Sequence, residues 1–136
     1  MNEPKDDIHQ LTDLQLSILR VLWSRGSATV QEITDALRSE RGLAQQTIAT
    51  VLTRLERRGI VRHETRQRQY IYSPVVTEPE VRRSMLAGLT ETLFEGDVAA
   101  LVTHLLSARE ISDGDLARVK QLIAAHESQR GSYHDD

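Results

Sequence analysis

The stretch that decides the fold of this chain runs Gln45-Gln46-Thr47-Ile48-Ala49-Thr50-Val51-Leu52-Thr53-Arg54-Leu55-Glu56-Arg57-Arg58-Gly59. Its apolar residues recur at helical spacing on one face, which predicts a helix from about residue 44 to residue 58. This core-facing set is Ile48, Val51, Leu52 and Leu55. Arginines followed by a glycine are typical of a helix C-terminus, because cations stabilise the negative end of the helix dipole. The opposite face is polar and presents Gln46, Thr50, Thr53 and Arg57.

Two shorter helices are predicted before this one. Thr12 and Gln15 stand at the spacing of a capping box, with an apolar, helically spaced run behind them. Thr29 and Glu32 repeat the pattern before a short second helix. Residues 39–43, which include a glycine, are expected to form the turn into the third helix.

A β-hairpin is predicted directly after the third helix. Residues 60–64 and 69–73 are β-prone runs, and residues 65–68 connect them. The connection carries Arg66 and Arg68, which gives the hairpin a basic tip, although no glycine fixes the type of turn. Three helices followed by a hairpin are the element order of a winged helix-turn-helix domain, expected over residues 10–75. The predicted fold class is therefore mainly α with a small β-hairpin.

Charge is distributed unevenly along the chain. The 136 residues carry 17 Lys and Arg against 20 Asp and Glu, a formal net charge of −3. Residues 38–72 hold eight arginines and three acidic residues, whereas residues 1–37 and 73–136 are both net acidic. The basic segment coincides with the third helix and the hairpin, so a polyanion is the expected partner of that part of the chain.

Double-stranded DNA is the polyanion that this pattern favours. An α-helix fits the major groove, and its outward side chains reach the edges of the bases. Gln45 and Gln46 lie in the first turn, where a glutamine can pair with adenine, and Thr50 and Thr53 can pack on thymine methyl groups. Contacts to phosphates or the minor groove are predicted for Arg54, Arg57, Arg66 and Arg68.

Two other interpretations stay open at this point. A polar helix face can simply be solvated, and charged residues can keep a turn soluble. A winged helix can also be a protein-interaction module without sequence-specific DNA binding, which an apolar outer face on the third helix would favour. We favour DNA, because the order of the elements, the hairpin and the segregation of charge all agree.

A second, helical region is expected over residues 76–128, after Pro74 and Pro79. Its apolar side chains are more than three lone helices can hide, so we favour a two-fold homodimer interface over a core shared with the first domain. Residues 1–9 and 129–136 are expected to be flexible tails. The candidate dimerisation residues are Val81, Met85, Leu89, Leu93, Phe94, Leu101, Leu105, Leu116, Val119 and Ile123.

The sequence argues against several classes of function. The chain has no cysteine, and its five histidines lack the i, i+4 spacing of a zinc-binding helix. It contains neither a Gly-x-Ser-x-Gly elbow nor a glycine-rich phosphate loop, so no enzyme, cofactor or metal site is predicted. Aromatic residues make up only 4%, which argues against stacking platforms. No apolar run approaches the roughly 18 residues of a membrane span, and the polar N-terminus is no signal peptide, so a cytoplasmic protein is expected.

Four stretches together resemble the penicillinase-repressor family of BlaI/MecI type. They are Leu11-Thr12-Asp13-Leu14-Gln15-Leu16-Ser17-Ile18-Leu19-Arg20-Val21-Leu22-Trp23, then Gln46-Thr47-Ile48-Ala49-Thr50-Val51-Leu52-Thr53-Arg54-Leu55 with Gly59, then Tyr70-Ile71-Tyr72 with Pro74, and Leu93-Phe94-Glu95-Gly96 with residues 101–106. The resemblance covers roughly residues 10–125. It implies a homodimeric transcriptional repressor that binds a palindromic operator and controls an antibiotic-resistance or cell-envelope stress gene. The positions that match the family's base-contacting residues are Gln46, Thr47, Ala49, Thr50 and Arg54.

The chain departs from the family in two respects. Copper-responsive relatives carry a cysteine-rich tail, which this chain lacks. Antibiotic-resistance repressors of the family are cleaved at an Asn-Phe pair when a membrane sensor metalloprotease is activated, and the matching position here is His104-Leu105. Because that pair differs, release of DNA is expected to use another trigger or a protease of different preference.

Overall fold

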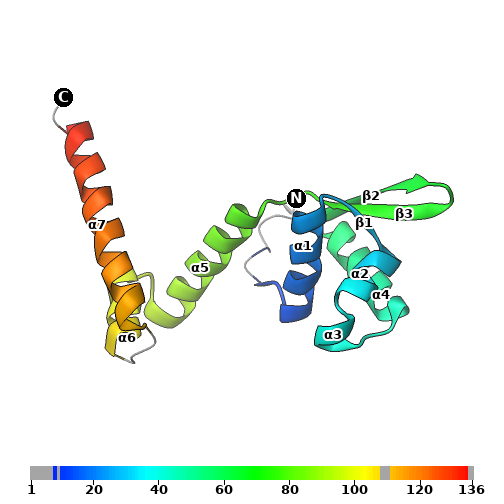
Figure 1. The fold of residues 1–136 in the computed structure, drawn as a ribbon, viewed down its shortest axis with the longest axis horizontal. Coiled ribbons are helices and arrows are strands. Elements are labelled where there is room, and N and C mark those ends of the chain that lie inside the picture. The colour runs from blue at the N-terminus through cyan, green and yellow to red at the C-terminus, as the bar shows by residue number, and fades with distance from the viewer. Residues whose placement is uncertain (1–7, 9, 108–110, 135–136) are drawn as a thin grey trace. The chain divides into compact units, whose positions relative to one another are not determined.

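The computed structural model describes residue 8, residues 10–107 and residues 111–134 (Figure 1). The N-terminal elements are α1 (Asp13–Arg25), β1 (Ala28–Thr29), α2 (Val30–Ala36), α3 (Arg38–Arg41), α4 (Gln45–Arg57), β2 (Val61–Arg66) and β3 (Gln69–Pro74). Three helices follow: α5 (Glu78–Phe94), α6 (Val98–Ser107) and α7 (Asp113–His134). The predicted order of three helices and a hairpin is confirmed, and the fold is that of a winged helix-turn-helix domain followed by helices.

Capping boxes begin three of the helices. At α1, the Thr12 N–H donates to Gln15 Oε1 at 2.9 Å and the Gln15 N–H donates to Thr12 Oγ1 at 3.2 Å. The predicted box at Thr29 and Glu32 is confirmed as well, with distances of 2.8 and 3.1 Å. Thr77 and Glu80 form a third capping box at the start of α5, which had not been predicted. These bonds satisfy N–H groups that the first helical turn leaves without partners.

The connection between α2 and α4 is more helical than the sequence predicts. Residues 38–41 form the single turn α3 where a turn over residues 39–43 was expected. The Arg38 guanidinium contacts the Asp35 carboxylate at 2.7 Å, and the Arg41 N–H donates to the Leu37 carbonyl at 2.9 Å. Gly42 ends the turn with φ 59°, a left-handed conformation that glycine adopts without steric cost.

The hairpin belongs to a three-stranded antiparallel sheet. The strand order is β1-β3-β2, with Ala28 opposite Tyr72 in one ladder and His63 opposite Tyr72 in the other. Strand β1 had not been predicted, because two residues are too few to show an alternating pattern. The sheet joins the segment after α1 to the hairpin, so the root of the wing is held on both sides.

The core of the N-terminal unit lies where α1, α2 and α4 pack against the sheet. Fully buried side chains come from each of these elements, and the Trp23 indole N–H donates to the Val76 carbonyl at 2.9 Å. Val81, on the first turns of α5, is buried in the same core with 2% exposure. The largest fully buried side chains are Ile18, Leu19, Leu22, Ile33, Ile48, Leu52, Leu55, Ile60, Val61, Val76 and Val81.

The chain divides into two compact units, Met1–Thr92 and Leu93–Asp136. The first unit therefore takes in most of α5, whereas the sequence placed a boundary at residue 75. Helix α7 continues to His134, so residues 129–134 are helical where a flexible tail was expected. Ile8, within the other expected tail, is buried in the core of the N-terminal unit. The remaining tail residues, 1–7, 9, 135 and 136, lie outside the described residues.

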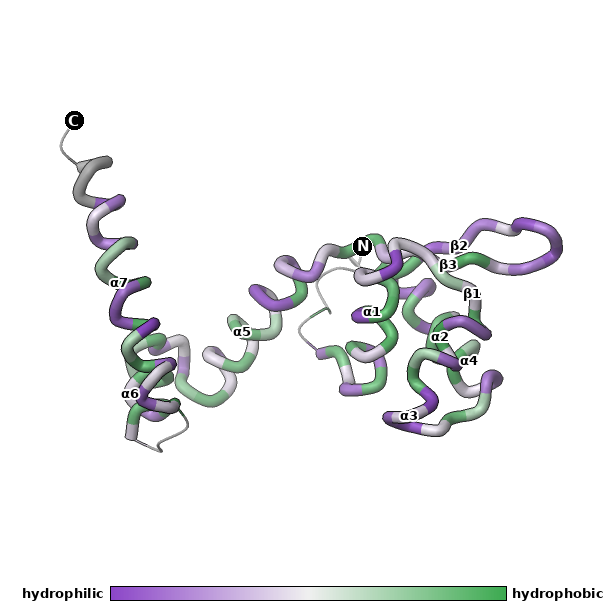
Figure 2. Tube along the Cα trace, in the orientation of Figure 1, coloured by the Kyte–Doolittle hydropathy of each residue, from purple (hydrophilic) through white to green (hydrophobic). Residues whose placement is uncertain are grey.

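The second unit carries an unusual amount of exposed apolar surface. Leu93, Val98, Leu122 and Ile123 are each more than half exposed. Hydrophobic segments recur along α5, α6 and α7 in Figure 2. Among the described residues, no apolar side chain after Val81 is buried.

The turn of the wing gives a direct test of the backbone geometry. Gln67 and Arg68 both have positive φ values, 51° and 69°, as a two-residue type I′ turn requires. Side chains in this conformation cost roughly 1–2 kcal/mol each. We therefore expect Gln67→Asn combined with Arg68→Gly to raise the free energy of unfolding by about 1 kcal/mol in urea titrations at fixed protein concentration. The control is Arg68→Ala, which removes the charge but keeps the strain; an equal gain from it would contradict this account.

Candidate nucleic-acid interface

The outward face of α4 is polar along its whole length. Ile48, Leu52 and Leu55 are buried, and this fixes which side of the helix faces away from the core. The face opposite them carries most of the residues predicted to meet DNA, and only Ala49 among the predicted base readers is half-buried. The exposed set is Gln45, Gln46, Thr47, Thr50, Thr53, Arg54 and Arg57.

The N-terminus of α4 has no side-chain cap. Its N-cap residue is Ala44, whose methyl group cannot accept a hydrogen bond, whereas α1 and α2 both begin with a capping threonine. The first N–H groups of a helix lack partners within the helix and carry partial positive charge. Gln45 and Gln46 stand at this end, so backbone donors and two exposed amide side chains are presented together.

Two threonines of the predicted site use their hydroxyl protons within the helix. Thr50 Oγ1 donates to the Gln46 carbonyl and Thr53 Oγ1 donates to the Ala49 carbonyl, both at 3.0 Å. A hydroxyl has one proton to donate, so each threonine offers a methyl group and an accepting oxygen to a partner. The Tyr72 hydroxyl lies in hydrogen-bonding contact with Thr53, so this predicted base reader also contacts the sheet.

One cluster of side chains connects α4 to the wing. His63 Nδ1 on β2 lies 2.7 Å from each carboxylate oxygen of Glu56 on α4. The His63 ring stacks on Tyr70 with a centroid distance of 3.9 Å and an interplanar angle of 15°. It is also tilted against Tyr72 at 5.6 Å. This grouping of Glu56, His63, Tyr70 and Tyr72, with Thr53, is the helix–wing cluster.

The wing is exposed and basic. Arg66 and Arg68 both lie in solvent at the end of the hairpin, and the Arg66 guanidinium contacts the Glu64 carboxylate at 2.6 Å. Such exposed pairs contribute little stability and are easily exchanged for another anion. Arg62, also exposed on β2, had not been singled out from the sequence, although it lies within the basic segment that the charge distribution revealed. It shares a polar pocket of about 340 Å³ with Ser27, Arg66 and Ser73.

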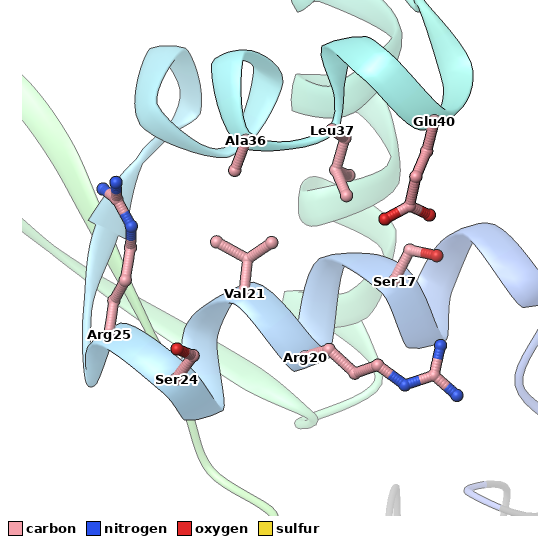
Figure 3. Close-up of a pocket in the computed structure, with 8 residues that line it drawn as sticks. All are labelled: Ser17, Arg20, Val21, Ser24, Arg25, Ala36, Leu37 and Glu40. Carbon is pink, nitrogen blue, oxygen red and sulfur yellow. The ribbon is translucent and has the colours of Figure 1, made fainter.

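Two further depressions lie in the N-terminal unit. One, of about 250 Å³, is shown in Figure 3: Ala36 and Leu37 point toward Val21 of α1, and Glu40 points toward Ser17. The Arg41 guanidinium donates to Ser17 Oγ at 3.3 Å, which ties α3 to α1. The other is a more apolar groove of about 510 Å³ between α1 and α5; it is lined by Leu16, Arg20, Trp23, Glu78, Val81, Arg82, Met85, Leu86 and Leu89.

A family model for the penicillinase repressor matches residues 11–125. The chain belongs to the penicillinase repressor family. Transcriptional regulator BlaI of Mycobacterium tuberculosis is 31% identical over 121 residues, which cover 86% of this repressor and 88% of that protein. The penicillinase repressor of Bacillus licheniformis is 22% identical over 90% of this chain and 96% of its own. The complex structure of hsRosR-S4 matches with TM-score 0.53 and 20% identity over 93% and 97% of the two chains, which shows the fold.

Family membership settles the class of protein. The family is one of transcriptional repressors with winged-helix DNA-binding domains, which are not enzymes. Among the described residues, no group of three histidine, aspartate or glutamate side chains is placed to hold a metal ion. In the same part of the chain, no helix is both long and apolar enough to cross a membrane.

The predicted dimerisation residues of the repressor fall into two groups. Val81 lies in the core of the N-terminal unit and Met85 packs against that core, so Val81 is withdrawn as a dimer contact. Its periodicity was that of a buried helix face, which sequence alone cannot assign to one core or another. The remaining predicted residues are half-buried or exposed, namely Leu89, Leu93, Phe94, Leu101, Leu105, Leu116, Val119 and Ile123.

Tyr72 gives a pH-dependent test of the site. Burial raises the pKa of the Tyr72 hydroxyl above its ordinary value of 10.0; the carboxylate of Glu56 and Tyr70 act in the same direction, and the hydrogen bond with Thr53 opposes them. Ionisation therefore favours the unfolded chain, so this contribution to stability is full below pH 10.0 and is lost as pH rises through the raised folded value.

We expect the free energy of unfolding of the wild-type repressor to fall more steeply above pH 10.0 than that of Tyr72→Phe. The ultraviolet absorbance of phenolate should rise at high pH in both proteins, because the variant keeps the other two tyrosines. The wild type should show an additional step, displaced above pH 10.0, that Tyr72→Phe lacks. Identical pH dependence in the two proteins would mean that Tyr72 is not buried as described.

Proposed function

We propose that this repressor acts as a homodimer that binds a palindromic operator with α4 in the major groove and the wing on the adjacent backbone. The observation that supports this most strongly is the exposed polar face of α4, set in a segment with eight arginines and three acidic residues. A helix of this width enters the major groove, whose base edges distinguish all four base pairs. The face is polar, so it does not favour docking on an apolar protein surface.

The proposed base readers lie on the first three turns of α4. Gln45 and Gln46 have both donor and acceptor groups for a base edge, with adenine the natural partner of a glutamine. The uncapped N–H groups beside them suit a phosphate, which would fix how deeply the helix enters the groove. Thr47 is exposed at the same end, Thr50 offers its methyl group, and Thr53 and the half-buried Ala49 complete the set.

The proposed phosphate contacts come from both α4 and the wing. Arg54 and Arg57 lie at the C-terminal end of α4, and Arg66 and Arg68 at the end of the wing. Each phosphate that an arginine neutralises releases condensed counterions, so affinity falls as salt rises. An arginine at the wing tip can also enter a narrow minor groove, whose potential is strongly negative.

The second unit supports the homodimer. Several of its large apolar side chains, among them Leu93, Val98, Leu122 and Ile123, are more than half exposed, which is more apolar surface than a monomer normally leaves in water. A two-fold interface would cover this surface and place two α4 helices one DNA turn apart. The net negative charge of residues 73–136 would keep this part away from the phosphates.

The regulated gene and the release mechanism belong to the same proposal. The names of its relatives, a penicillinase repressor and a methicillin resistance regulatory protein, support an antibiotic-resistance gene as the target. A cell-envelope stress gene is the other target that the family resemblance implies. His104 and Leu105, where a sensor metalloprotease would be expected to direct cleavage, are exposed but lie within α6. Proteases bind extended chains, so cleavage there would require α6 to unfold locally. The proposed role puts the protein in the cytoplasm, where a bacterial chromosome lies.

The division between base readers and phosphate contacts can be tested on selected DNA. Random-sequence duplexes that bind the repressor are enriched and sequenced, and the strongest binder is compared with a scrambled duplex. Gln46→Ala should lower the preference for the selected duplex by about 1–3 kcal/mol, because a base-specific pairing is lost. Arg57→Ala should weaken both duplexes alike and reduce the slope of log affinity against log salt by about 1.

The matched control for this experiment is Arg83→Ala, an exposed arginine on α5 outside the proposed interface. Unchanged binding by both Gln46→Ala and Arg57→Ala would contradict the assigned roles. If no duplex is enriched even at low salt, the proposed DNA binding itself is wrong and a protein-interaction module becomes the better account.

The dimer surface can be tested by adding charge to it. Leu105→Glu combined with Ile123→Glu places carboxylates on two exposed apolar positions of the second unit. We expect the variant to sediment as a monomer. It should bind the selected duplex at least about tenfold more weakly, because only one winged-helix domain binds DNA at a time.

Val75→Glu, an exposed apolar position of the N-terminal unit, is the matched control and should sediment as the wild type does. A doubly substituted protein that remains a dimer would show that the interface lies elsewhere.

A further inference from the structure

The proposed interface is built from two elements, α4 and the wing, whose relative orientation must match the DNA. At the root of the hairpin the backbone fixes this orientation, since the Ile60 N–H donates to the Leu55 carbonyl at 2.9 Å. The wing then runs out through β2 to the turn at residues 67 and 68. An error in its angle at the root would grow toward the tip, where Arg66 and Arg68 stand.

The helix–wing cluster is placed to prevent such an error. His63 is the third residue of β2, so its link to Glu56 holds the hairpin beyond its root. Glu56 lies on the last turn of α4, on the same stretch that carries Arg54 and Arg57. The contact therefore joins the two groups of proposed DNA-binding arginines through one pair of side chains.

The geometry of the pair is restrictive. Both carboxylate oxygens of Glu56 lie 2.7 Å from His63 Nδ1, and the two side chains are only about a quarter to a third exposed. A carboxylate can only accept, so Nδ1 must carry the proton, which it does in the charged ring and in one neutral tautomer. The remaining freedom of the ring is removed by its stack on Tyr70 and its contact with Tyr72.

We propose that Glu56 and His63 are positioning residues that hold the wing at a set angle to α4, so that both engage one DNA site together. This inference rests on the proposed DNA binding and assigns neither residue a contact with DNA. Tyr70 braces the histidine from the outer part of the hairpin, and Tyr72 and Thr53 close the inner side of the cluster. A carboxylate at a DNA interface repels phosphate, so its presence here fits a role directed at the wing.

The orientation of the wing can be measured without DNA. The chain has no cysteine, so Gln45→Cys and Gln69→Cys give one pair of spin labels in each protomer, one at the start of α4 and one on β3 near the turn. The labelled protein is mixed with an excess of unlabelled wild-type protein, so that most dimers carry labels on one protomer only. Distance distributions between the labels are recorded by pulsed electron paramagnetic resonance. The labelled reference protein, which keeps His63, is compared with labelled proteins that also carry His63→Ala or His63→Asn. Asparagine keeps a donor near the position of Nδ1.

We expect His63→Ala to broaden the distance distribution and His63→Asn to keep it closer to that of the reference protein. Glu56→Gln, which removes the charge and one accepting oxygen of the pair, should also broaden the distribution. Its matched control is Glu40→Gln, which changes an exposed carboxylate on α3 and should leave the distribution unchanged. The proposal would be overturned if His63→Ala changed neither the width nor the mean of the distance distribution.

The consequence for binding is tested on the strongest duplex from the random-sequence selection. His63→Ala is measured in the wild-type background and in one that carries Arg66→Ala and Arg68→Ala. A positioning role acts through the wing arginines, so the loss of affinity should be about tenfold with the arginines present and should nearly vanish without them. Equal losses in both backgrounds would show a general effect on folding and overturn the assignment.

This inference and the proposed function fail in different ways. If the wild-type protein selects a duplex but His63→Ala binds it with unchanged affinity, DNA binding stands and the positioning role falls. If no duplex is selected, both fall. Thermal unfolding of each variant is measured as well, to establish that the losses of DNA affinity are measured on folded protein.

Discussion

The structure depends on the burial of one face of α4. Ile48, Leu52 and Leu55 are removed from water where α4 packs against α2 and the sheet, which stabilises the fold by about 1.5–3 kcal/mol for each side chain. The same burial fixes the rotation of the helix about its axis. Because the helix cannot turn, its glutamines, threonines and arginines stay on one outward face, and the domain presents a preformed surface.

The sequence was most informative where local rules act alone. The boxes at Thr12 and Thr29 and the helix Gln45–Arg57 follow from short-range spacing, and each is confirmed. The resemblance to the penicillinase-repressor family, carried by motifs along the chain, is confirmed as well. Contacts between distant segments could not be derived in this way. The pairing of Ala28 with Tyr72 and the approach of Glu56 to His63 exist only once the hairpin folds back on α4.

Hydrophobic periodicity predicted which residues of α5 share one face, but it did not predict which of them are buried. Val81 and Leu89 lie on the same apolar stripe of α5, yet Val81 is buried in the N-terminal core and Leu89 remains exposed. An apolar stripe predicts that a helix face will be covered, but it does not identify the segment or partner that covers it. The proposed site on α4 has a more specific pattern: an apolar face that the core covers, an opposite polar face and a local excess of arginine. A polyanion is the partner that suits the last two.

The central claim is that the outward face of α4 meets DNA, and backbone amide chemical shifts test it most directly. The uniformly ¹⁵N-labelled repressor would be titrated with the duplex that it selects from a random-sequence pool. The account predicts that the largest shift changes fall on the first turns of α4, around Gln45, Gln46 and Thr50, with a second group in the wing. Changes confined to the α1–α5 groove, with α4 unaffected, would contradict it.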